Sequence, residues 1–218
     1  MEQQLLPVGC VIMASGLARR FGSNKLLADF GGRPLLCRAL DATNTPQLAA
    51  RIVVTRSAEV EALCKAEGVP CLVHGLPGRN DTVRLGLDAL LAARPDLAGC
   101  MFLPGDQPLL QRETVESMVG IFGWDTKTRI ERQKETEREI FRLAHGFKND
   151  PNPLVGSPVL FSRSYFSELR TLPEGKGGSV LLRKYPERVH NIFIGDRNEL
   201  LDADTPEALA ELLRILRQ

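Results

Sequence analysis

A glycine-rich segment with closely spaced basic residues follows the first apolar run of the chain. The stretch VIMASGLARRFGSNKLL covers residues 11–27 and places Gly16, Arg20, Gly22 and Lys25 within ten positions. Glycines let a backbone approach an anion closely, and consecutive N–H groups in such a turn form a concave anion site. An arginine adds a planar fork that matches phosphate oxygens, and a lysine adds a compact point charge. The segment therefore predicts a loop that holds an anion.

Two common phosphate-binding loops do not account for this segment. The dinucleotide fingerprint GxGxxG is absent, because only Gly16 and Gly22 are available and they stand six positions apart. The pattern GxxxxGK[ST] also fails. Its tail is imitated by GKGGS at residues 175–179, but the earlier glycine and a preceding strand are missing there.

The arrangement that remains resembles the signature of the MobA-like nucleotidyltransferases, small-x-G-x-x-x-R-M-G-x-x-K. Its positions are filled by Ala14-Ser15-Gly16, Arg20-Phe21-Gly22 and Lys25, with Phe21 in place of the usual methionine. Three later segments are also similar to the family: GRNDTVRLGL (78–87) to its nucleotide-contacting turn and helix, PGDQPLL (104–110) to its metal-binding segment, and LLDADTPEALAEL (200–212) to its closing segment.

The resemblance implies a set of site residues. Asp106 and Asp204 are the implied Mg²⁺ ligands. The implied nucleotide-binding residues are Ala14, Ser15, Gly16, Gly22, Lys25, Arg79, Asp81 and Thr82. Several of these have a structural alternative: Lys25 as an exposed residue at a helix entry, Asp106 as a turn residue, Asp204 as a helix N-cap, and Arg79 as a solvated loop residue.

The chemistry of nucleotidyl transfer accounts for the same residues. An acceptor phosphate attacks the α-phosphorus of a nucleoside triphosphate and pyrophosphate leaves, so catalysis consists mostly of positioning and charge stabilisation. We expect backbone N–H groups of residues 15–22 to cradle the β- and γ-phosphates. Mg²⁺ takes one or two carboxylates and completes its shell with phosphate and water, which suits Asp106 and Asp204. We expect Arg20, Lys25 and Asp106 to be catalytic, with Lys25 reaching the α-phosphate.

The first loop also carries a hypothesis about the base. Met13-Ala14-Ser15-Gly16 is nearer the AAG of the molybdenum-cofactor cytidylyltransferases than the LAGG of the guanylyltransferase branch, and GDQP at residues 105–108 also resembles the cytidylyl branch. We hypothesise that the side chains of Ala14 and Ser15 narrow the pocket and favour a pyrimidine. The resemblance implies transfer of CMP from CTP to a phosphate of a molybdopterin-type cofactor, with a molybdenum hydroxylase or its maturation factor as a protein partner.

Two other hypotheses about the function stay open. RNDTVRLGL (79–87) resembles the R-x-D-S-V turn of methylerythritol-phosphate cytidylyltransferases, which keeps a cytidylyl- or guanylyltransferase for a polyol or sugar phosphate in view. Ser157, Lys176 and Ser179 depart from the family pattern on the acceptor side. Those departures favour a non-catalytic cofactor-maturation partner, whereas the presence of Lys25 and both aspartates counts against it.

Strands and helices alternate through most of the chain. Apolar runs predict strands at residues 8–14, 50–56, 69–75 and 99–104, and helical spacing predicts helices at 34–42, 57–67, 82–93 and 112–121, with Ser57 as N-cap and Gly68 as the stop. This rhythm predicts an α/β fold with a doubly wound, mostly parallel sheet and helices on both faces, which is Rossmann-like. Ligands of such sheets lie at the carboxyl ends of the strands, where both unusual segments fall.

The remaining expectations concern the whole chain. The 218 residues are expected to form a single nucleotidyltransferase domain, with a charged insertion-like segment at about 124–142 that is either an exposed helix ending in a strand near 140–145 or a partner surface. The formal net charge is only +1, so we expect no nucleic-acid partner. No stretch is apolar enough to span a membrane, and the start lacks a signal-peptide pattern, so the cytoplasm is expected. The five cysteines form no CxxC pair and are expected to be reduced core residues.

Overall fold

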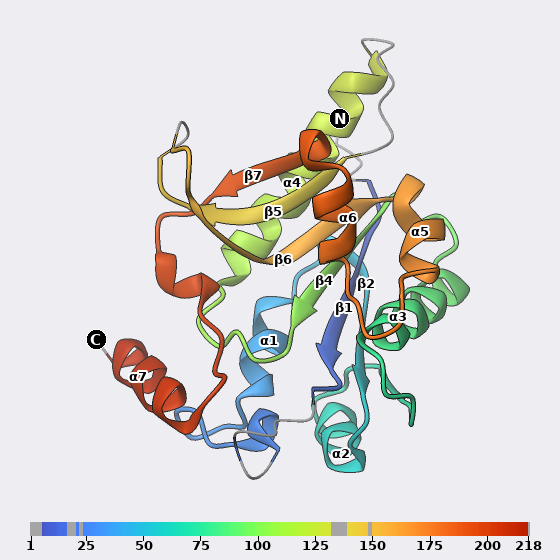
Figure 1. Cartoon of the computed structure of the whole chain (residues 1–218). Helices are drawn as coiled ribbons and strands as arrows, with labels where there is room; N and C mark the ends of the chain where they lie inside the picture. The colour runs from blue at the N-terminus through green and yellow to red at the C-terminus, as the bar shows by residue number, and fades with distance from the viewer. Residues whose placement is uncertain (1–5, 17–20, 22–23, 132–138, 148–149, 218) are drawn as a thin grey trace.

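The computed structural model describes residues 6–16, 21, 24–131, 139–147 and 150–217, and within them one seven-stranded sheet is flanked by helices (Figure 1). The strands are β1 (Val8–Ala14), β2 (Leu48–Thr55), β3 (Cys71–Val73), β4 (Gly99–Pro104), β5 (Ile140–His145), β6 (Leu154–Ser162) and β7 (Val189–Phe193). The α-helices are α1 (Leu36–Ala42), α2 (Ala58–Ala66), α3 (Arg79–Ala93), α4 (Arg112–Glu131), α5 (Phe166–Arg170), α6 (Ser179–Lys184) and α7 (Pro206–Leu216). Short 3₁₀ helices include η1 (Lys25–Leu27) and η4 (Arg197–Leu200).

The sheet has the strand order β3-β2-β1-β4-β6-β5-β7. β1 pairs in parallel with β2 and β4, β2 with β3, and β5 with β7. β6 runs antiparallel to both of its neighbours, β4 and β5. The sheet is therefore mixed but mostly parallel, and the predicted α/β fold is confirmed.

Helices cover both faces of the sheet because successive residues of a strand point to opposite sides. On β1, Cys10 and Ile12 belong to the core cluster that includes buried residues of α1, α2 and α4. Val11 belongs instead to the cluster that includes buried residues of α3, α5 and α6. A third, smaller cluster packs α7 against the segment around Phe30 and Leu35. The two sides of one short strand thus anchor the two helical layers visible in Figure 1.

The strand order reverses between β1 and β4. The chain runs from β1 outward to β2 and β3, and then returns to place β4 on the other side of β1. The carboxyl ends of β1 and β4 are adjacent, since Met13 pairs with Pro104. Ligands of open α/β sheets bind in the crevice outside the carboxyl ends of the strands at such a reversal. The first loop and the GDQP turn both leave the sheet at this point.

Two strands were not expected from the sequence. β6 covers part of the stretch NDPNPLVGSP, whose prolines and glycine indicate a loop, and β7 was not anticipated at all. β6 is stabilised by antiparallel pairing on both sides, which local sequence patterns do not reveal. By contrast, Ser57 caps α2 as predicted, accepting a hydrogen bond from the Val60 N–H at 3.3 Å.

Several expectations about the whole chain can also be compared with the structure. α4 extends through residue 131, and β5 spans Ile140–His145, where the charged segment was expected to end in a strand. All five cysteines are free thiols, and Cys10, Cys37, Cys64 and Cys100 are buried. None of the helices described here combines the length and the apolar character needed to cross a membrane.

Candidate active site

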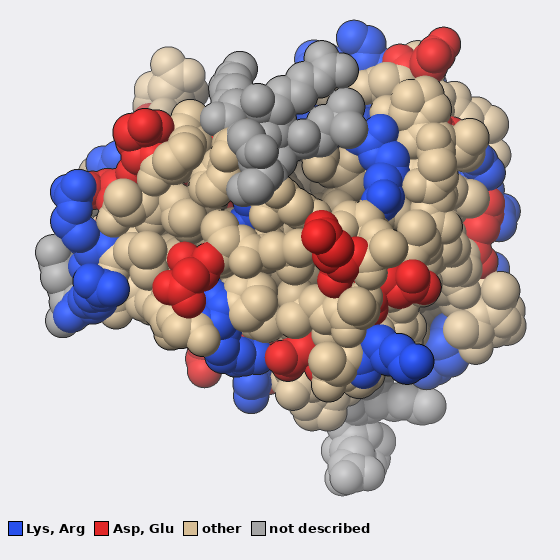
Figure 2. Space-filling model, turned by 90° about the horizontal axis from the view of Figure 1, so that it is seen from below, with Lys and Arg blue, Asp and Glu red and all other residues tan. Residues whose placement is uncertain are grey.

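A cavity of about 940 Å³ opens beyond the ends of β1 and β4. Figure 2 views the molecule from the side on which these strands end, and acidic and basic side chains are interspersed over that face. The cavity is lined by Met13, Ser15, Gly16, Lys25, Leu26, Arg56, Pro77, Gly78, Arg79, Thr82, Pro104, Asp106, Ser157, Gly175, Asp202 and Asp204. Its charged groups come from the first loop, the end of β2, the GDQP turn, the start of α3 and the segment before α7.

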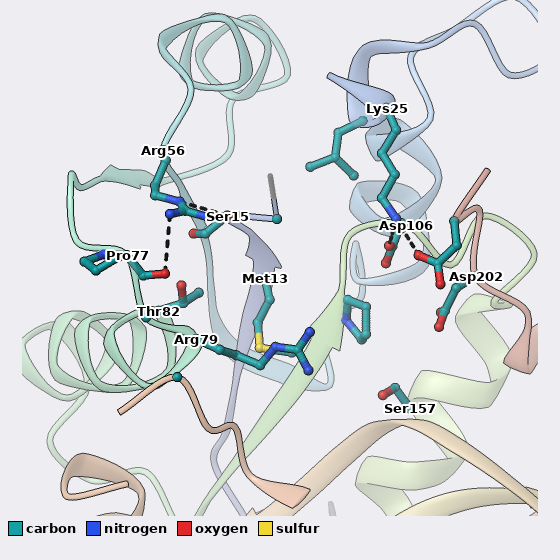
Figure 3. A pocket seen from close by; sticks show the side chains of 16 residues that line it. Met13, Ser15, Lys25, Arg56, Pro77, Arg79, Thr82, Asp106, Ser157 and Asp202 are labelled. Carbon is teal, nitrogen blue, oxygen red and sulfur yellow. Dashed lines mark hydrogen bonds and ion pairs between the residues drawn. The ribbon is translucent and has the colours of Figure 1, made fainter. Parts of the chain in front are cut away.

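Lys25 lies between two carboxylates on one side of the cavity (Figure 3). Its Nζ is 2.5 Å from Asp106 Oδ2 and 2.9 Å from Asp204 Oδ1. Lys25 is only 8% exposed. The alternative interpretation of Lys25 as an exposed residue at a helix entry is therefore wrong. Burial alone would lower the pKa of Lys25, but hydrogen bonds to Asp106 and Asp204 outweigh it, and the pKa is raised. Lys25 is therefore held as a charged ammonium group between two acids.

Local backbone contacts bring these three residues together. Asn24 caps η1 by accepting a hydrogen bond from the Leu26 N–H at 3.2 Å, which fixes the start of the turn that carries Lys25. The GDQP turn is tied to β1 because the Gly105 N–H donates to the Met13 carbonyl at 3.0 Å. The Ala203 N–H donates to the Asp106 carbonyl at 2.9 Å, which joins the segment before α7 to the same turn.

The segment before α7 contributes a third carboxylate that sequence reasoning did not single out. Asp202 lines the cavity, and the intervening Ala203 is buried. Partial burial, together with the charges of Asp106 and Asp204, raises the pKa of Asp202 to about 6. The N-cap of α7 is Thr205, which accepts a hydrogen bond from the Ala208 N–H at 3.1 Å. Asp204 does not cap this helix, so its side chain remains directed to Lys25.

The opposite side of the cavity is formed by residues at the ends of β1 and β2. Arg56 directly follows β2, and its Nε donates to the Ser15 carbonyl at 2.9 Å. A second Arg56 nitrogen, Nη2, donates to the same carbonyl, and Nη1 donates to the Pro77 carbonyl at 3.4 Å. Figure 3 shows Arg56, Ser15, Pro77 and Thr82 facing Lys25 and Asp106 across the cavity. Sequence reasoning missed Arg56, whose only local signal is its place as the first basic residue after an apolar strand.

A third part of the cavity lies at the start of α3. Arg79 extends across the cavity toward Ser157 in Figure 3. The loop before α6 packs against this helix: the Gly175 N–H donates to Asn80 Oδ1 at 2.9 Å, and a Cβ on Gly177 would lie 2.8 Å from the Arg79 side chain. The absence of a side chain at Gly177 therefore leaves room for Arg79.

The other sequence-predicted residues lie in different places. Ser15, Gly16, Arg79 and Thr82 line the cavity, together with Lys25, Asp106 and Asp204. Ala14 is the buried last residue of β1 and does not line it. Asp81 caps α3, because its Oδ2 accepts a hydrogen bond from the Gly78 N–H at 3.1 Å, and it also pairs with Arg84 at 3.3 Å. Arg20 and Gly22 lie outside the described residues.

The carboxylates suit a divalent cation that arrives with phosphate. Within the described ranges, no group of three or more His, Cys, Asp or Glu side chains is arranged to hold a metal ion alone. Asp106 and Asp204 nevertheless direct oxygen atoms at one point, now taken by the Lys25 ammonium. Mg²⁺ commonly uses one or two carboxylates and draws its other ligands from substrate phosphates and water. The donor set therefore fits Mg²⁺.

Comparison with known protein families gives one extended match. Residues 10–189 match the model of the MobA-like NTP transferase domain. Among curated proteins, the chain is 34% identical over 109 residues to a molybdenum cofactor guanylyltransferase of Rhodopseudomonas palustris, covering 48% of this chain and 50% of that protein. It is 28% identical over 175 residues to a 3-deoxy-manno-octulosonate cytidylyltransferase of Chlorobaculum tepidum, covering 76% and 68%. The first two curated relatives are matched over 41% and 54% of their length, so the chain spans about half of each.

Solved structures share the fold over nearly the whole chain. The protein Rv0371c of Mycobacterium tuberculosis superposes with a TM-score of 0.73 at 24% identity, covering 96% of this chain and 98% of that one. A second structure of that mycobacterial protein was determined in complex with manganese, with a TM-score of 0.71 at 23% identity, covering 95% and 98%. At this identity the likeness shows the fold.

Proposed function

Because the chain belongs to the MobA-like NTP transferase family, we propose that it is a nucleotidyltransferase that transfers CMP from CTP to a phosphate of a molybdopterin-type cofactor. An acceptor phosphate oxygen forms a bond to the α-phosphorus of CTP, the bond from that phosphorus to the bridging oxygen breaks, and pyrophosphate leaves. The observation that carries the proposal is the placement of Lys25 between Asp106 and Asp204, in the same cavity as Ser15 and Gly16.

Each charged group has a distinct part in the proposed reaction. Asp106 and Asp204 would hold Mg²⁺, which supplies positive charge to the triphosphate oxygens when it is bound. Lys25 is proposed to exchange its two carboxylate partners for the α-phosphate, where it stabilises negative charge during transfer. Ser15 and Gly16 begin the segment whose backbone N–H groups are proposed to contact the β- and γ-phosphates. Arg20 is proposed to contact the same phosphates.

Positioning explains why these groups are effective together. The ammonium of Lys25 is buried beside the two carboxylates that are proposed to hold Mg²⁺, so its charge stays within the cavity when metal and phosphate replace these partners. Arg79 and Ser157 lie in a different part of the cavity from Lys25. The space between Lys25 and these two residues is available for an acceptor. We propose that the acceptor approaches the α-phosphorus from the side of Arg79 and Ser157, opposite the departing pyrophosphate.

The choice of CTP rests on the first loop and the GDQP turn. The sequence around Ser15 resembles the cytidylyl branch, and Ser15 is the residue of the Ala14–Ser15 pair that lines the cavity. The curated relatives include both guanylyl- and cytidylyltransferases, one class acting in molybdenum cofactor synthesis and the other on 3-deoxy-manno-octulosonate. A sugar-type acceptor is therefore the second candidate, favoured by the longer of these alignments.

Release of pyrophosphate separates these candidates. The protein is incubated with Mg²⁺, CTP or GTP, and either molybdenum-loaded molybdopterin or a panel of sugar and polyol phosphates together with 3-deoxy-manno-octulosonate. We expect the fastest release with CTP and molybdopterin. Faster release with a sugar-type acceptor supports the second candidate, and a clear preference for GTP contradicts the base assignment. No release with any pair favours a non-catalytic maturation partner.

A further inference from the structure

Two residues outside the family signature form a polar network around Ser15: Arg56, which lines the cavity, and His74, which does not. Ser15, Arg56 and His74 are the residues that directly follow β1, β2 and β3. These three parallel strands are in register at their ends, where the last paired row consists of Ala14, Thr55 and Val73. Ser15, Arg56 and His74 therefore occupy the next row, side by side across the sheet.

Hydrogen bonds around His74 assign its neutral form. The Leu76 N–H donates to His74 Nδ1 at 3.2 Å, so Nδ1 carries no proton. The Ser15 hydroxyl donates to the Val54 carbonyl at 3.0 Å, which leaves Ser15 Oγ as the acceptor for the Nε2–H of His74 at 3.1 Å. With the proton of His74 on Nε2, the imidazole, the Leu76 N–H, the Ser15 hydroxyl and the Val54 carbonyl all have hydrogen-bond partners.

The surroundings of His74 keep it in this form. Partial burial and the nearby positive charge of Arg56 lower the pKa of His74, and Arg84 acts in the same direction, against an opposing contribution from Asp81. Protonation at Nδ1 would also set a second N–H against the Leu76 N–H. His74 is therefore a hydrogen-bond donor to Ser15 at neutral pH.

These contacts fix both the side chain and the backbone carbonyl of Ser15. Its side chain is fixed by His74 and the Val54 carbonyl, and its own carbonyl accepts two hydrogen bonds from Arg56. Ser15 lines the cavity, whereas His74 is not among the lining residues. Any effect of His74 on a ligand must therefore pass through Ser15 or through Thr82, whose Oγ1 lies 3.4 Å from His74 Nε2.

We propose that His74 is a positioning residue that, by its hydrogen bond to Ser15, holds the start of the phosphate-binding loop in the conformation that receives a nucleoside triphosphate. This inference rests on the proposed function, because it takes the cavity to be the triphosphate site. It adds a residue from the end of β3 to the site at the carboxyl ends of β1, β2 and β4. It assigns His74 an effect on affinity with little effect on the chemical step.

Three variants test the role of this hydrogen bond. His74→Phe keeps a flat ring but removes both nitrogen atoms, and His74→Gln restores an N–H donor toward Ser15. His145→Gln is the matched control, since His145 is also half-buried, does not line the cavity, and places Nδ1 3.2 Å from the Ile194 carbonyl oxygen. Binding of CTP and of GTP with Mg²⁺ is measured by calorimetry without any acceptor, and melting curves establish that each variant is folded.

The expected results separate this inference from the proposed function. His74→Phe should weaken binding of the preferred nucleotide about five- to tenfold, the loss expected for one hydrogen bond. His74→Gln should remain within threefold of the wild type, and His145→Gln should be unchanged. In turnover assays the KM of the Phe variant should rise by a similar factor, while kcat changes less than twofold. Equal binding by wild type and a folded Phe variant overturns the inference alone. Absence of any nucleotide binding by the wild type overturns the proposed function and this inference with it.

A pH series adds a readout that a purely structural role would not move. Lowering the pH through the depressed pKa of His74 adds a proton at Nδ1, which sets an N–H against the Leu76 N–H and disturbs the position of the ring. It should therefore weaken nucleotide binding by the wild type more than by His74→Gln, whose side chain does not titrate in this range. His145→Gln should follow the wild type, because protonation of the nucleotide itself is common to all variants. Identical pH profiles for wild type and His74→Gln would contradict the inference.

Discussion

The ammonium group of Lys25 balances two carboxylates while it is almost fully buried. A buried charge is stable only when it is paired and hydrogen-bonded, and Asp106 and Asp204 provide both kinds of contact. In the proposed reaction the same charge is placed at the α-phosphate. The residue therefore stabilises the free cavity and, in the presence of nucleotide, the developing negative charge.

Replacement of Lys25 should slow the chemical step strongly. Lys25→Met is expected to reduce turnover about 10²–10³-fold, by analogy with removal of one donor from an oxyanion hole, which costs roughly 2.7–4 kcal/mol. Lys65→Met is the control, because Lys65 is exposed near the end of α2. Pyrophosphate release under saturating CTP gives both rates. A Lys25→Met enzyme that turns over within threefold of the wild type would remove Lys25 from the catalytic set.

The ion pairs of Lys25 also predict how the free protein binds metal. In the absence of nucleotide the ammonium takes the point at which Asp106 and Asp204 converge, so a divalent cation must displace it against charge repulsion. Lys25→Met should therefore bind Mn²⁺ about tenfold or more tightly than the wild type when no nucleotide is present. The concentration of free Mn²⁺ is measured by electron paramagnetic resonance. Equal affinities would show that Lys25 does not compete with the metal.

At the scale of elements, close contact between α3 and the sheet positions Arg79 and Thr82. A Cβ added to Gly86 would lie 2.6 Å from Val11 Cγ1 and 3.0 Å from Val54 Cγ2, so the helix can approach β1 and β2 only because this residue has no side chain. Neither valine can move freely, because both are fully buried. The start of α3, which carries the cavity residues, depends on this approach.

Substitution of Gly86 should destabilise the fold, although alanine favours helices. Gly86→Ala is expected to lower the free energy of unfolding by about 1–2 kcal/mol, since overpacking outweighs the gain in helix propensity. Gly120→Ala in α4 is the matched control, because nothing lies within 4 Å of its added Cβ, and it should stabilise by up to about 1 kcal/mol. Urea unfolding measures both. A stabilising effect of Gly86→Ala would refute the packing argument.

Elements whose local sequence pattern agrees with their final structure were the easiest to predict. β1 has the predicted bounds of residues 8–14, because a short β-branched run between a proline and glycine-rich residues has one favourable conformation. β6 was missed because its proline and glycine content masks a strand that depends on pairing with β4 and β5. Element order was sufficient to place the carboxyl ends of β1 and β4 at one crevice.

The candidate site was predictable where segments of the sequence resemble motifs of the MobA-like family. Lys25, Asp106 and Asp204 were singled out from separate segments, and the structure brings them within hydrogen-bond distance. Arg56 and His74 were not found, because each is a single polar residue after a strand, and their relation to Ser15 arises from the register of three strands. The catalytic roles of all these residues remain predictions.

At the scale of the molecule, one cavity joins segments from residue 13 to residue 204. A ligand that binds there should stabilise the folded state as a whole. Mg²⁺ with CTP at about 100 times its dissociation constant is expected to add about 2.7 kcal/mol, or roughly 5–10 °C in Tm for a chain of this size. Differential scanning fluorimetry measures the shift, with Mg²⁺ alone as the control. No shift with CTP or GTP would mean that the cavity does not bind a triphosphate.

The most direct test is the mass of the product formed from CTP, Mg²⁺ and molybdenum-loaded molybdopterin. A nucleotidyltransferase of the proposed specificity yields the cytidylylated cofactor and one pyrophosphate for each CTP consumed, and the Lys25→Met protein yields little of either in the same time. Unchanged CTP with this acceptor and with every sugar-type acceptor, or equal product from the wild type and Lys25→Met, would contradict the proposal that the cavity between β1 and β4 is the active site.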